Sequence, residues 1–389
     1  MIMKICWFCI PAYGHTNPTL ELVKKLTSLG HEVYYFSFEK FREKIEAAGG
    51  KFIGCDSYEP EMSPGSDKDN ITNDLAASTE LLVSATLALD EMSMKKINEI
   101  KPDLIVSDSV AYWGKLAAVK CGIPYVSSTT TFAFNRYSAK YMKQGFSEMV
   151  NMFMSMPKIN KQIKRLQDNG YPVKSIIDIV QNDNETNTIV YTSDYFQPCA
   201  ETFSDKYCFI GPSIRPAGET FEKSDKKTVF ISMGTVIKNE NFFNECIDAF
   251  SGTDYRVIIS LGNNNKLSRD SLPDNIKVYD FVDQMAVLAE SDMFITHCGM
   301  NSVSEALYFG VPLILCPQTA EQSSVAKRVE ELGAGILLKA ADKKSITEAV
   351  GKISGDTCYK KSADKISESF KKSGGAEKAA RFLESIAGK

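Results

Sequence analysis

Short apolar runs of strand length alternate with longer amphipathic segments along most of the chain, and this alternation narrows the fold more than any other feature. Such runs suit strands buried on both faces, and the longer segments suit helices that connect one parallel strand to the next. The pattern therefore predicts an α/β protein with mostly parallel sheets. The predicted strands of the first half are 4–10, 32–38, 51–54, 103–108, 124–128, 187–193 and 207–212. The helices between them are predicted to begin near Asn17, Glu39, Ile71 and Val110.

The second half repeats the arrangement, with predicted strands at 228–233, 255–261, 276–281, 293–298 and 312–317. The segment 213–227 between the halves is charged and contains Pro and Gly, which is typical of a linker. A chain of 389 residues also exceeds one ordinary core. We predict two Rossmann-like, doubly wound domains facing one another across a cleft. The predicted boundaries are 1–212, a linker at 213–227, 228–370, and a C-terminal helix at 371–389 that packs back toward the first domain.

Composition excludes several classes of partner. A net charge of −4 provides no electrostatic footprint for nucleic acid or anionic membrane. No apolar run is long enough to span a membrane, and the N-terminal run leads into a strand–turn–helix pattern rather than a cleavage site. The ten cysteines are scattered, and Cys6 and Cys9 are predicted to point to opposite faces of a strand. We expect reduced thiols, a cytoplasmic location, no metal, and a monomer or weak dimer.

Two polar residues are predicted to meet at one edge of the first sheet. With strand order 3-2-1-4-5, the carboxyl ends of strands one and four are neighbours, and ligands bind in the crevice beyond them. The first strand runs into "PAYGHTNP" (11–18), which carries His15, and the fourth ends in Asp108. A carboxylate bonded to an imidazole fixes its tautomer and raises its basicity, as a general base near pH 7 requires. Bland alternatives are a capping or turn role for His15 and an N-cap role for Asp108.

Three polar loops are predicted to converge at the corresponding edge of the second sheet. They are "SMGT" (232–235), "HCGMNS" (297–302) and "PQTAEQ" (317–322). Glycine lets the backbone approach a ligand closely, and the second loop opens a helix whose N-terminus favours a phosphate, to which His297 could donate. Neither the dinucleotide fingerprint nor the phosphate loop of ATP-binding proteins is present. Ordinary turn chemistry is the alternative. We expect a nucleotide-activated group to be transferred across the cleft.

The segment "FVDQMAVLAESDMFITHCGMNSVSEALYFGVPLILCPQTAEQ" (281–322) resembles the donor-binding signature of the family-1 UDP-glycosyltransferases. The segment "IPAYGHTNPTLELVKKLTSLGHEVYYFS" (10–37) is similar to the N-terminus of the macrolide-glycosyltransferase branch. The resemblance spans nearly the whole chain. It implies a GT-B fold and metal-independent, inverting transfer of a sugar, glucose being the expected one, from UDP-sugar to an acceptor hydroxyl. UDP-sugar is then a co-substrate, and no cofactor is expected.

The resemblance also implies roles for individual residues. His15 matches the general base and Asp108 its orienting partner. The implied donor site comprises Gly14, Gly234, Thr235, Phe281, Val282, Gln284, His297, Gly299, Asn301, Ser302, Glu305, Glu321 and Gln322. Within it, the uracil lies against Phe281, Glu305 binds the ribose, and Glu321 with Gln322 holds sugar hydroxyls. Many relatives have Trp in place of Phe281 and Pro in place of Asp283, and plant members have Trp in place of Met300, so UDP and dTDP both stay open as donors.

The acceptor pocket is predicted in the first domain, where a small hydrophobic phenol, flavonoid or macrolide would bind. Its expected residues are Trp113, Phe132, Phe134 and Met142. Five methionines at 141–156 suit an adaptable pocket, although their helical spacing favours a helix core. The third histidine, His31, is expected to be structural. Two rivals stay open: a non-catalytic protein that binds nucleotide sugars, and a GT-B enzyme of other chemistry, such as an epimerase or a lipid-linked sugar transferase.

Overall fold

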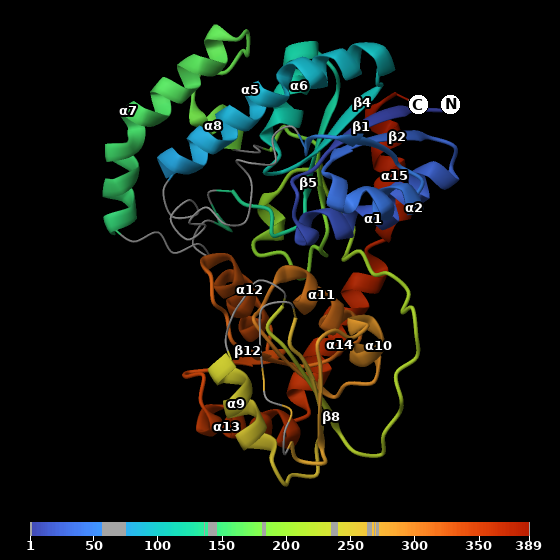
Figure 1. Cartoon of the computed structure of the whole chain (residues 1–389), viewed down its shortest axis with the longest axis vertical. Helices are drawn as coiled ribbons and strands as arrows, with labels where there is room; N and C mark the ends of the chain where they lie inside the picture. The colour runs from blue at the N-terminus through green and yellow to red at the C-terminus, as the bar shows by residue number, and fades with distance from the viewer. Residues whose placement is uncertain are drawn as a thin grey trace.

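Two parallel sheets lie in separate halves of the molecule, one before and one after the segment 213–227 (Figure 1). The computed structural model describes residues 2–56, 75–135, 137–138, 146–180, 184–234, 240–262, 267, 269 and 272–388. All of the paired strands in both sheets run parallel within these residues. The α/β class predicted from the alternating pattern is thereby confirmed.

The first sheet has the strand order β3-β2-β1-β4-β5-β6-β7. Its strands are β1 (Lys4–Phe8), β2 (Glu32–Ser37), β3 (Lys51–Gly54), β4 (Leu104–Asp108), β5 (Tyr125–Thr129), β6 (Thr188–Val190) and β7 (Tyr207–Phe209). The strand order reverses at β1, which pairs with β2 on one side and β4 on the other. The switch point therefore lies between the carboxyl ends of β1 and β4, where it was predicted.

The second sheet has the same order, β10-β9-β8-β11-β12-β13. Its strands are β8 (Thr228–Ser232), β9 (Arg256–Ser260), β10 (Ile276–Tyr279), β11 (Met293–Thr296), β12 (Leu313–Leu315) and β13 (Gly335–Leu337). Strand β13 was not predicted, and it is only three residues long and begins with a glycine. The switch point of this sheet lies between β8 and β11.

Most of the described connections between strands contain a helix, as is usual between parallel strands. The helices are α1 (Tyr13–Ser28), α2 (Arg42–Ala47), α5 (Leu75–Ile100), α6 (Tyr112–Cys121), α7 (Phe146–Asp168), α8 (Ile176–Val180), α9 (Glu240–Phe250), α10 (Gln284–Ala289), α11 (Met300–Tyr308), α12 (Ala320–Glu331), α13 (Lys343–Gly355), α14 (Cys358–Lys372) and α15 (Gly375–Ile386). Short 3-10 turns occupy η1 (Glu39–Phe41) and η4 (Ala200–Thr202). Helix α1 begins at Tyr13 and not near Asn17, so the prediction of its start was wrong. Its first turn includes the Gly-His pair that the sequence suggested was a turn.

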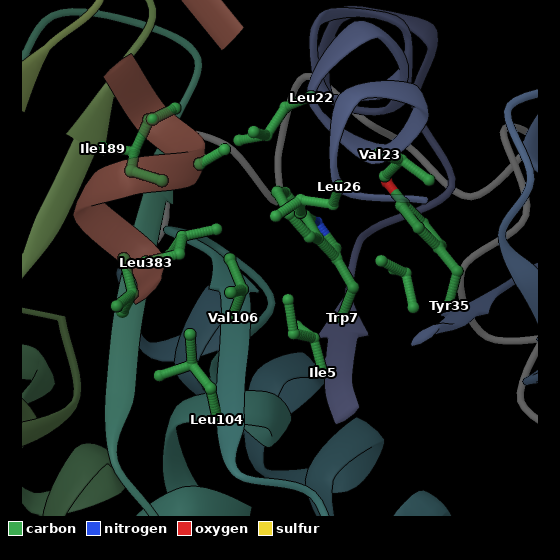
Figure 2. Close-up of a cluster of buried hydrophobic side chains, with 14 of the residues drawn as sticks. Ile5, Trp7, Leu22, Val23, Leu26, Tyr35, Leu104, Val106, Ile189 and Leu383 are labelled. Atoms are coloured by element: carbon green, nitrogen blue, oxygen red, sulfur yellow. The ribbon is translucent and has the colours of Figure 1, made fainter. Parts of the chain in front are cut away.

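The last helix packs on the first domain. Leu383 of α15 lies in one buried cluster with Trp7 of β1, Leu22 and Leu26 of α1, and Val106 of β4 (Figure 2). All of these side chains are fully buried, and each large apolar one contributes about 1.5–3 kcal/mol relative to exposure. The chain therefore begins and ends in the same domain (Figure 1).

The chain crosses between the domains at two neighbouring places. The Gly375 backbone N–H donates to the Ile210 carbonyl (2.9 Å), so the start of α15 lies beside the end of the first sheet. Nearby, the Ser193 and Ser369 hydroxyls are 2.8 Å apart. The start of the linker and the turn between α14 and α15 thus run side by side.

Aromatic side chains fill the space between the two domains at this crossing. The Phe196 ring packs against Phe132 and Phe370, with ring centroids 5.4 and 5.5 Å apart. The Arg328 guanidinium of α12 donates to the Tyr195 and Phe196 carbonyls at 2.8 and 2.9 Å. The second domain therefore holds the 193–197 segment of the first through both apolar packing and charge-assisted hydrogen bonds.

Two further sequence expectations concern cysteines and membranes. All ten cysteines are free thiols. Cys6 and Cys9 are buried in different core clusters, as the predicted opposite faces require. Among the described residues, no helix combines the length and the apolar character needed to cross a bilayer.

Candidate active site

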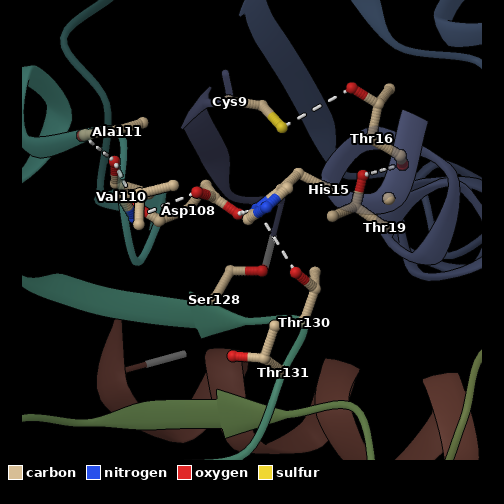
Figure 3. A network of polar contacts seen from close by, with 12 residues as sticks. Cys9, His15, Thr16, Thr19, Asp108, Val110, Ala111, Ser128, Thr130 and Thr131 are labelled. Atoms are coloured by element: carbon tan, nitrogen blue, oxygen red, sulfur yellow. Dashed lines mark hydrogen bonds and ion pairs between the residues drawn. The ribbon is translucent and has the colours of Figure 1, made fainter. Parts of the chain in front are cut away.

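His15 and Asp108 are in direct contact at the switch point of the first sheet. His15 is the third residue of α1, Asp108 is the last residue of β4, and His15 Nδ1 lies 2.7 Å from Asp108 Oδ2 (Figure 3). The Asp108 carboxylate is buried, with its residue 1 % exposed, whereas the His15 side chain keeps 22 % of its surface accessible. Thr130 Oγ1, just after β5, lies 3.3 Å from the same ring nitrogen. Asp108 is thus buried beneath the imidazole, and the His15 ring keeps part of its surface open to solvent.

Neither His15 nor Asp108 is the N-cap residue of a helix, although the Asp108 side chain bonds the turn that leads into α6. Helix α1 is N-capped by Ala12 and α6 by Ala111, neither with a side-chain cap. Asp108 instead accepts the Val110 backbone N–H at Oδ1 (3.0 Å), which leaves Oδ2 for His15. The carboxylate is therefore held in orientation by the turn that follows it, and its free oxygen faces the imidazole.

Charge near His15 favours its protonated form. Burial disfavours the imidazolium, but the attraction and hydrogen bond of Asp108, with a further contribution from Glu321, outweigh it and raise the pKa of His15. His15 in turn lowers the pKa of the Glu321 carboxyl, but burial raises that pKa by more, so its net shift is upward. Carboxylates from both domains therefore act on one histidine.

The N-terminus of α11 is open toward an anion. Its N-cap is Gly299, which has no side chain, whereas the neighbouring α10 and α12 are capped by Asp283 and Thr319. The first N–H groups of α11 therefore lack a side-chain acceptor, and the first turn holds no acidic residue. Backbone donors and the helix dipole together favour a phosphate at this end.

His297 lies between two glycines at this point. A Cβ on Gly234, whose φ is +72°, would be 2.7 Å from His297 Cε1, and a Cβ on Gly299 would be 2.7 Å from Nε2. Only glycine at both places leaves room for the ring. Burial lowers the pKa of His297 to about 4, so the imidazole is neutral at pH 7. Its buried Nδ1 finds no hydrogen-bond partner among the described residues, and Thr235, beside Gly234, lies outside them.

A second group of predicted donor residues lies along α10 and α11. Gln284 Nε2 donates to Glu305 Oε2 (2.5 Å) and to Ser302 Oγ (3.4 Å). Burial raises the pKa of Glu305, although Gln284 opposes the shift. The Phe281 ring is 58 % exposed just before α10, and Val282 packs against the core of the second domain. An exposed ring beside a bonded carboxylate and amide suits a flat base attached to a sugar.

Asp283 ties the linker to this group. Its carboxylate receives Arg215 Nη2 (2.7 Å) and Nη1 (3.2 Å), the Gly218 N–H (2.7 Å) and the Met285 N–H (3.1 Å). Burial opposes its charge, but Arg215 and the backbone donors hold the pKa of Asp283 below its usual value. Asp283 therefore caps α10 and anchors the interdomain segment.

The third loop brings Glu321 toward the first domain. Helix α12 starts there, with Thr319 Oγ1 accepting the Gln322 N–H (3.3 Å). The Gln322 side chain is engaged locally, since its Oε1 accepts the Gln318 N–H (2.8 Å). The charge of Glu321 contributes to the raised pKa of His15 in the other domain. Glu321 is thus the member of the predicted pair whose charge acts on a residue of the other domain.

Within the part of the chain that the structure describes, a hydrogen bond joins the two sides of the site. Asn301 Nδ2, in the first turn of α11, donates to the Gly14 carbonyl of α1 (3.1 Å). Gly14 directly precedes His15. The structure therefore brings together the His15–Asp108 pair, the open end of α11 and Glu321 at the junction of the domains.

The predicted acceptor residues are largely not gathered there. Trp113 is buried in a core of the first domain and Phe132 in the aromatic packing between domains, so neither ring is open to an acceptor. Both are aromatic residues near the site, but each fills a gap between elements, which sequence does not distinguish from a pocket wall. Phe134 is partly buried, and Met142 lies outside the described residues.

Comparison with known proteins decides the family. The uncharacterised UDP-glucosyltransferase YojK of Bacillus subtilis is 32% identical over 97% of this chain and 96% of its own length. The NDP-glycosyltransferase YjiC of the same organism is 33% identical over 97% of this chain and 95% of its own. The chain belongs to the macrolide-type branch of the family-1 glycosyltransferases. The C-terminal domain model of erythromycin biosynthesis protein CIII-like proteins matches residues 244–381 of this glycosyltransferase.

The fold of this family-1 glycosyltransferase matches solved structures. The kitacinnamycin glycosyltransferase superimposes with a TM-score of 0.86 at 23% identity, covering 99% of each chain. The predicted GT-B fold is confirmed.

Two polar residues beside the site of this glycosyltransferase were not predicted. Thr130 follows β5, so extending the switch-point argument by one strand would have found it. Arg215 lies in the linker, and its neighbours in the sequence do not indicate a role for it, because its partner Asp283 is distant in sequence.

Proposed function

We propose that this glycosyltransferase transfers glucose, with inversion, from UDP-glucose to a hydroxyl of a small hydrophobic acceptor. The observation that carries the proposal is the hydrogen-bonded His15–Asp108 pair lying across the domain junction from the uncapped N-terminus of α11. A base and an anion site on opposite sides of a gap suit displacement at an anomeric carbon, in which nucleophile and leaving group occupy opposite faces.

In the proposed reaction, His15 is the general base. Its Nδ1 is engaged by Asp108, so Nε2 is the nitrogen that takes the acceptor's hydroxyl proton. The acceptor oxygen bonds to the anomeric carbon as the bond to the diphosphate breaks, and UDP leaves with the electron pair. Backbone N–H groups of α11 and the neutral His297 stabilise the charge on the leaving diphosphate, which is a preorganised electrostatic role that requires no metal or cofactor.

Donor and acceptor classes rest on different observations. Phe281, Gln284 and Glu305 suit a base and a ribose, and the similarity to the UDP-glucosyltransferase YojK supports uracil and glucose.

On the acceptor side, the exposed apolar side chains of Tyr13 and Val110 neighbour the catalytic pair in sequence. An aromatic and an aliphatic surface there favour a hydrophobic acceptor, such as a phenol or a macrolide.

The test is acceptor-dependent release of UDP from UDP-glucose with a panel of phenolic and macrolide acceptors. We expect release only with an acceptor, and a product heavier by one hexose in mass spectrometry. A dTDP-glucose arm separates the two donors. UDP-glucose binding without transfer to any acceptor from either donor would favour the non-catalytic alternative.

The raised pKa of His15 gives a pH prediction. The base must be neutral, so kcat/KM falls as the pH drops through a pKa above the usual histidine value. Glu321→Gln removes one contribution that raises this pKa, and we expect the acidic limb of the profile to move to lower pH. Glu330→Gln, an exposed change on the same helix α12, is the control and leaves the limb in place. An unmoved limb in Glu321→Gln would contradict the coupling.

A further inference from the structure

Helix α1 contains a proline where its hydrogen-bond ladder should continue. Pro18 is the sixth residue of the helix and is buried. In an α-helix the carbonyl of residue 14 accepts the N–H of residue 18, but proline has no N–H, and its ring pushes that carbonyl outward. The Gly14 carbonyl, one residue before His15, is therefore deprived of its usual helical partner.

The second domain supplies a donor at that carbonyl. Asn301 Nδ2 donates to it at 3.1 Å, although the two residues are 287 positions apart. Asn301 lies in the first turn of α11, whose N-cap Gly299 leaves the helix end open. A Cβ on Gly14 would lie 3.8 Å from Asn301 Nδ2, so this amide passes directly over the glycine. The missing helical hydrogen bond thus becomes a contact between domains.

We propose that Pro18 is a positioning residue, which keeps the Gly14 carbonyl available for Asn301 and so sets the donor half of the site against His15. The inference rests on the proposed function, in which His15 is the base and α11 binds the diphosphate. His15 is already held by Asp108 within its own domain, at 2.7 Å. The hydrogen bond from Asn301 ties the start of α11 to the residue before His15, whereas the contacts of Phe196 and Arg328 hold the domains together elsewhere at the junction. Displacements of about 1 Å at reacting centres can reduce rates about 10²-fold, so such a contact acts on turnover.

The experiment is Pro18→Ala. Alanine restores the N–H of residue 18, which then competes for the Gly14 carbonyl. The change removes two buried methylene groups, which costs stability, but it also removes the larger penalty that a proline inside a helix carries. The melting temperature should therefore not fall. Loss of one interdomain hydrogen bond should lower kcat about five- to tenfold. The dissociation constant for UDP, measured by calorimetry, should stay at the wild-type value because Asn301 remains.

Pro157→Ala is the matched control. Pro157 also lies inside a helix, α7, but its side chain is exposed. The change has the same chemistry, and we expect kcat to be unaffected.

A double-mutant cycle isolates the contact. If Pro18 acts through Asn301, Pro18→Ala lowers kcat no further in an Asn301→Ala background. An unchanged kcat in Pro18→Ala would overturn the inference, as would a loss that persists in the Asn301→Ala background. These outcomes leave the proposed function intact. That function fails only if wild type does not transfer sugar, or if turnover survives the loss of His15.

Discussion

His15→Ala should lower kcat by about 10²–10⁴-fold, because a positioned general base typically contributes that much. The side chain has a buried carboxylate at Nδ1 and an accessible ring face, so alanine removes the base and leaves Asp108 without its partner. The open end of α11 is untouched by this change. We therefore expect UDP binding, measured by calorimetry, to persist while transfer is lost.

His31→Gln is the control for this experiment. His31 is buried in the same domain, where Nδ1 accepts the Met3 N–H (3.1 Å) and Nε2 meets Glu384 Oε1 (3.1 Å). Through these two contacts, His31 links α15 to the residues just before β1 and β2, away from the site. We expect His31→Gln to lower the melting temperature and to leave kcat unchanged. Turnover that survives His15→Ala would show that the base lies elsewhere.

Gly114→Ala should destabilise the first domain by about 3 kcal/mol or more, near or above the upper end of overpacking effects. A Cβ at Gly114 would be 2.4 Å from Ser107 Oγ and 2.6 Å from Phe8 Cβ. Neither can retreat, since the Ser107 hydroxyl donates to the Ala111 carbonyl (2.7 Å) and Phe8 is stacked on Phe36. Because α6 follows the loop after Asp108, the same change should also disturb the His15–Asp108 pair.

The measurement is urea unfolding monitored for each domain, since two domains need not unfold together. Gly351→Ala on α13 is the matched control. Its Cβ would have no neighbour within 4 Å, so replacing glycine in a helix should stabilise the second domain by about 0.5–1 kcal/mol. A Gly114→Ala variant as stable as wild type would mean that α6 can move away from β1 and β4.

The sheet order and the site geometry were predictable for one physical reason. Parallel strands joined by right-handed helical crossovers leave few orders, and the carboxyl ends of neighbouring strands must meet. This is why His15 and Asp108 could be paired from positions 93 residues apart. The same argument placed the α11 loop opposite them.

Side-chain burial was less predictable. Trp113 and Phe132 occupy sequence positions suited to a pocket, yet packing of Phe132 against Phe196 depends on how the domains meet. The start of α1 was missed for a local reason: Pro18 and Gly14 suggest a turn, but a helix tolerates both when another group satisfies the freed carbonyl. The ion pair of Asp283 with Arg215 was not predictable either, because the two residues are 68 positions apart, whereas the capping of α10 by Asp283 is local.

The double crossing between the domains has a mechanical consequence. Because the chain passes from one domain to the other twice, at Ile210 and at Gly375, and these two passages are hydrogen-bonded together, they act as a two-stranded strap. Two passages joined in this way restrict the relative movement of the domains more than a single linker would. Any movement of one domain against the other must therefore carry both passages together, and the arrangement seen here is the one in which Asn301 reaches the Gly14 carbonyl.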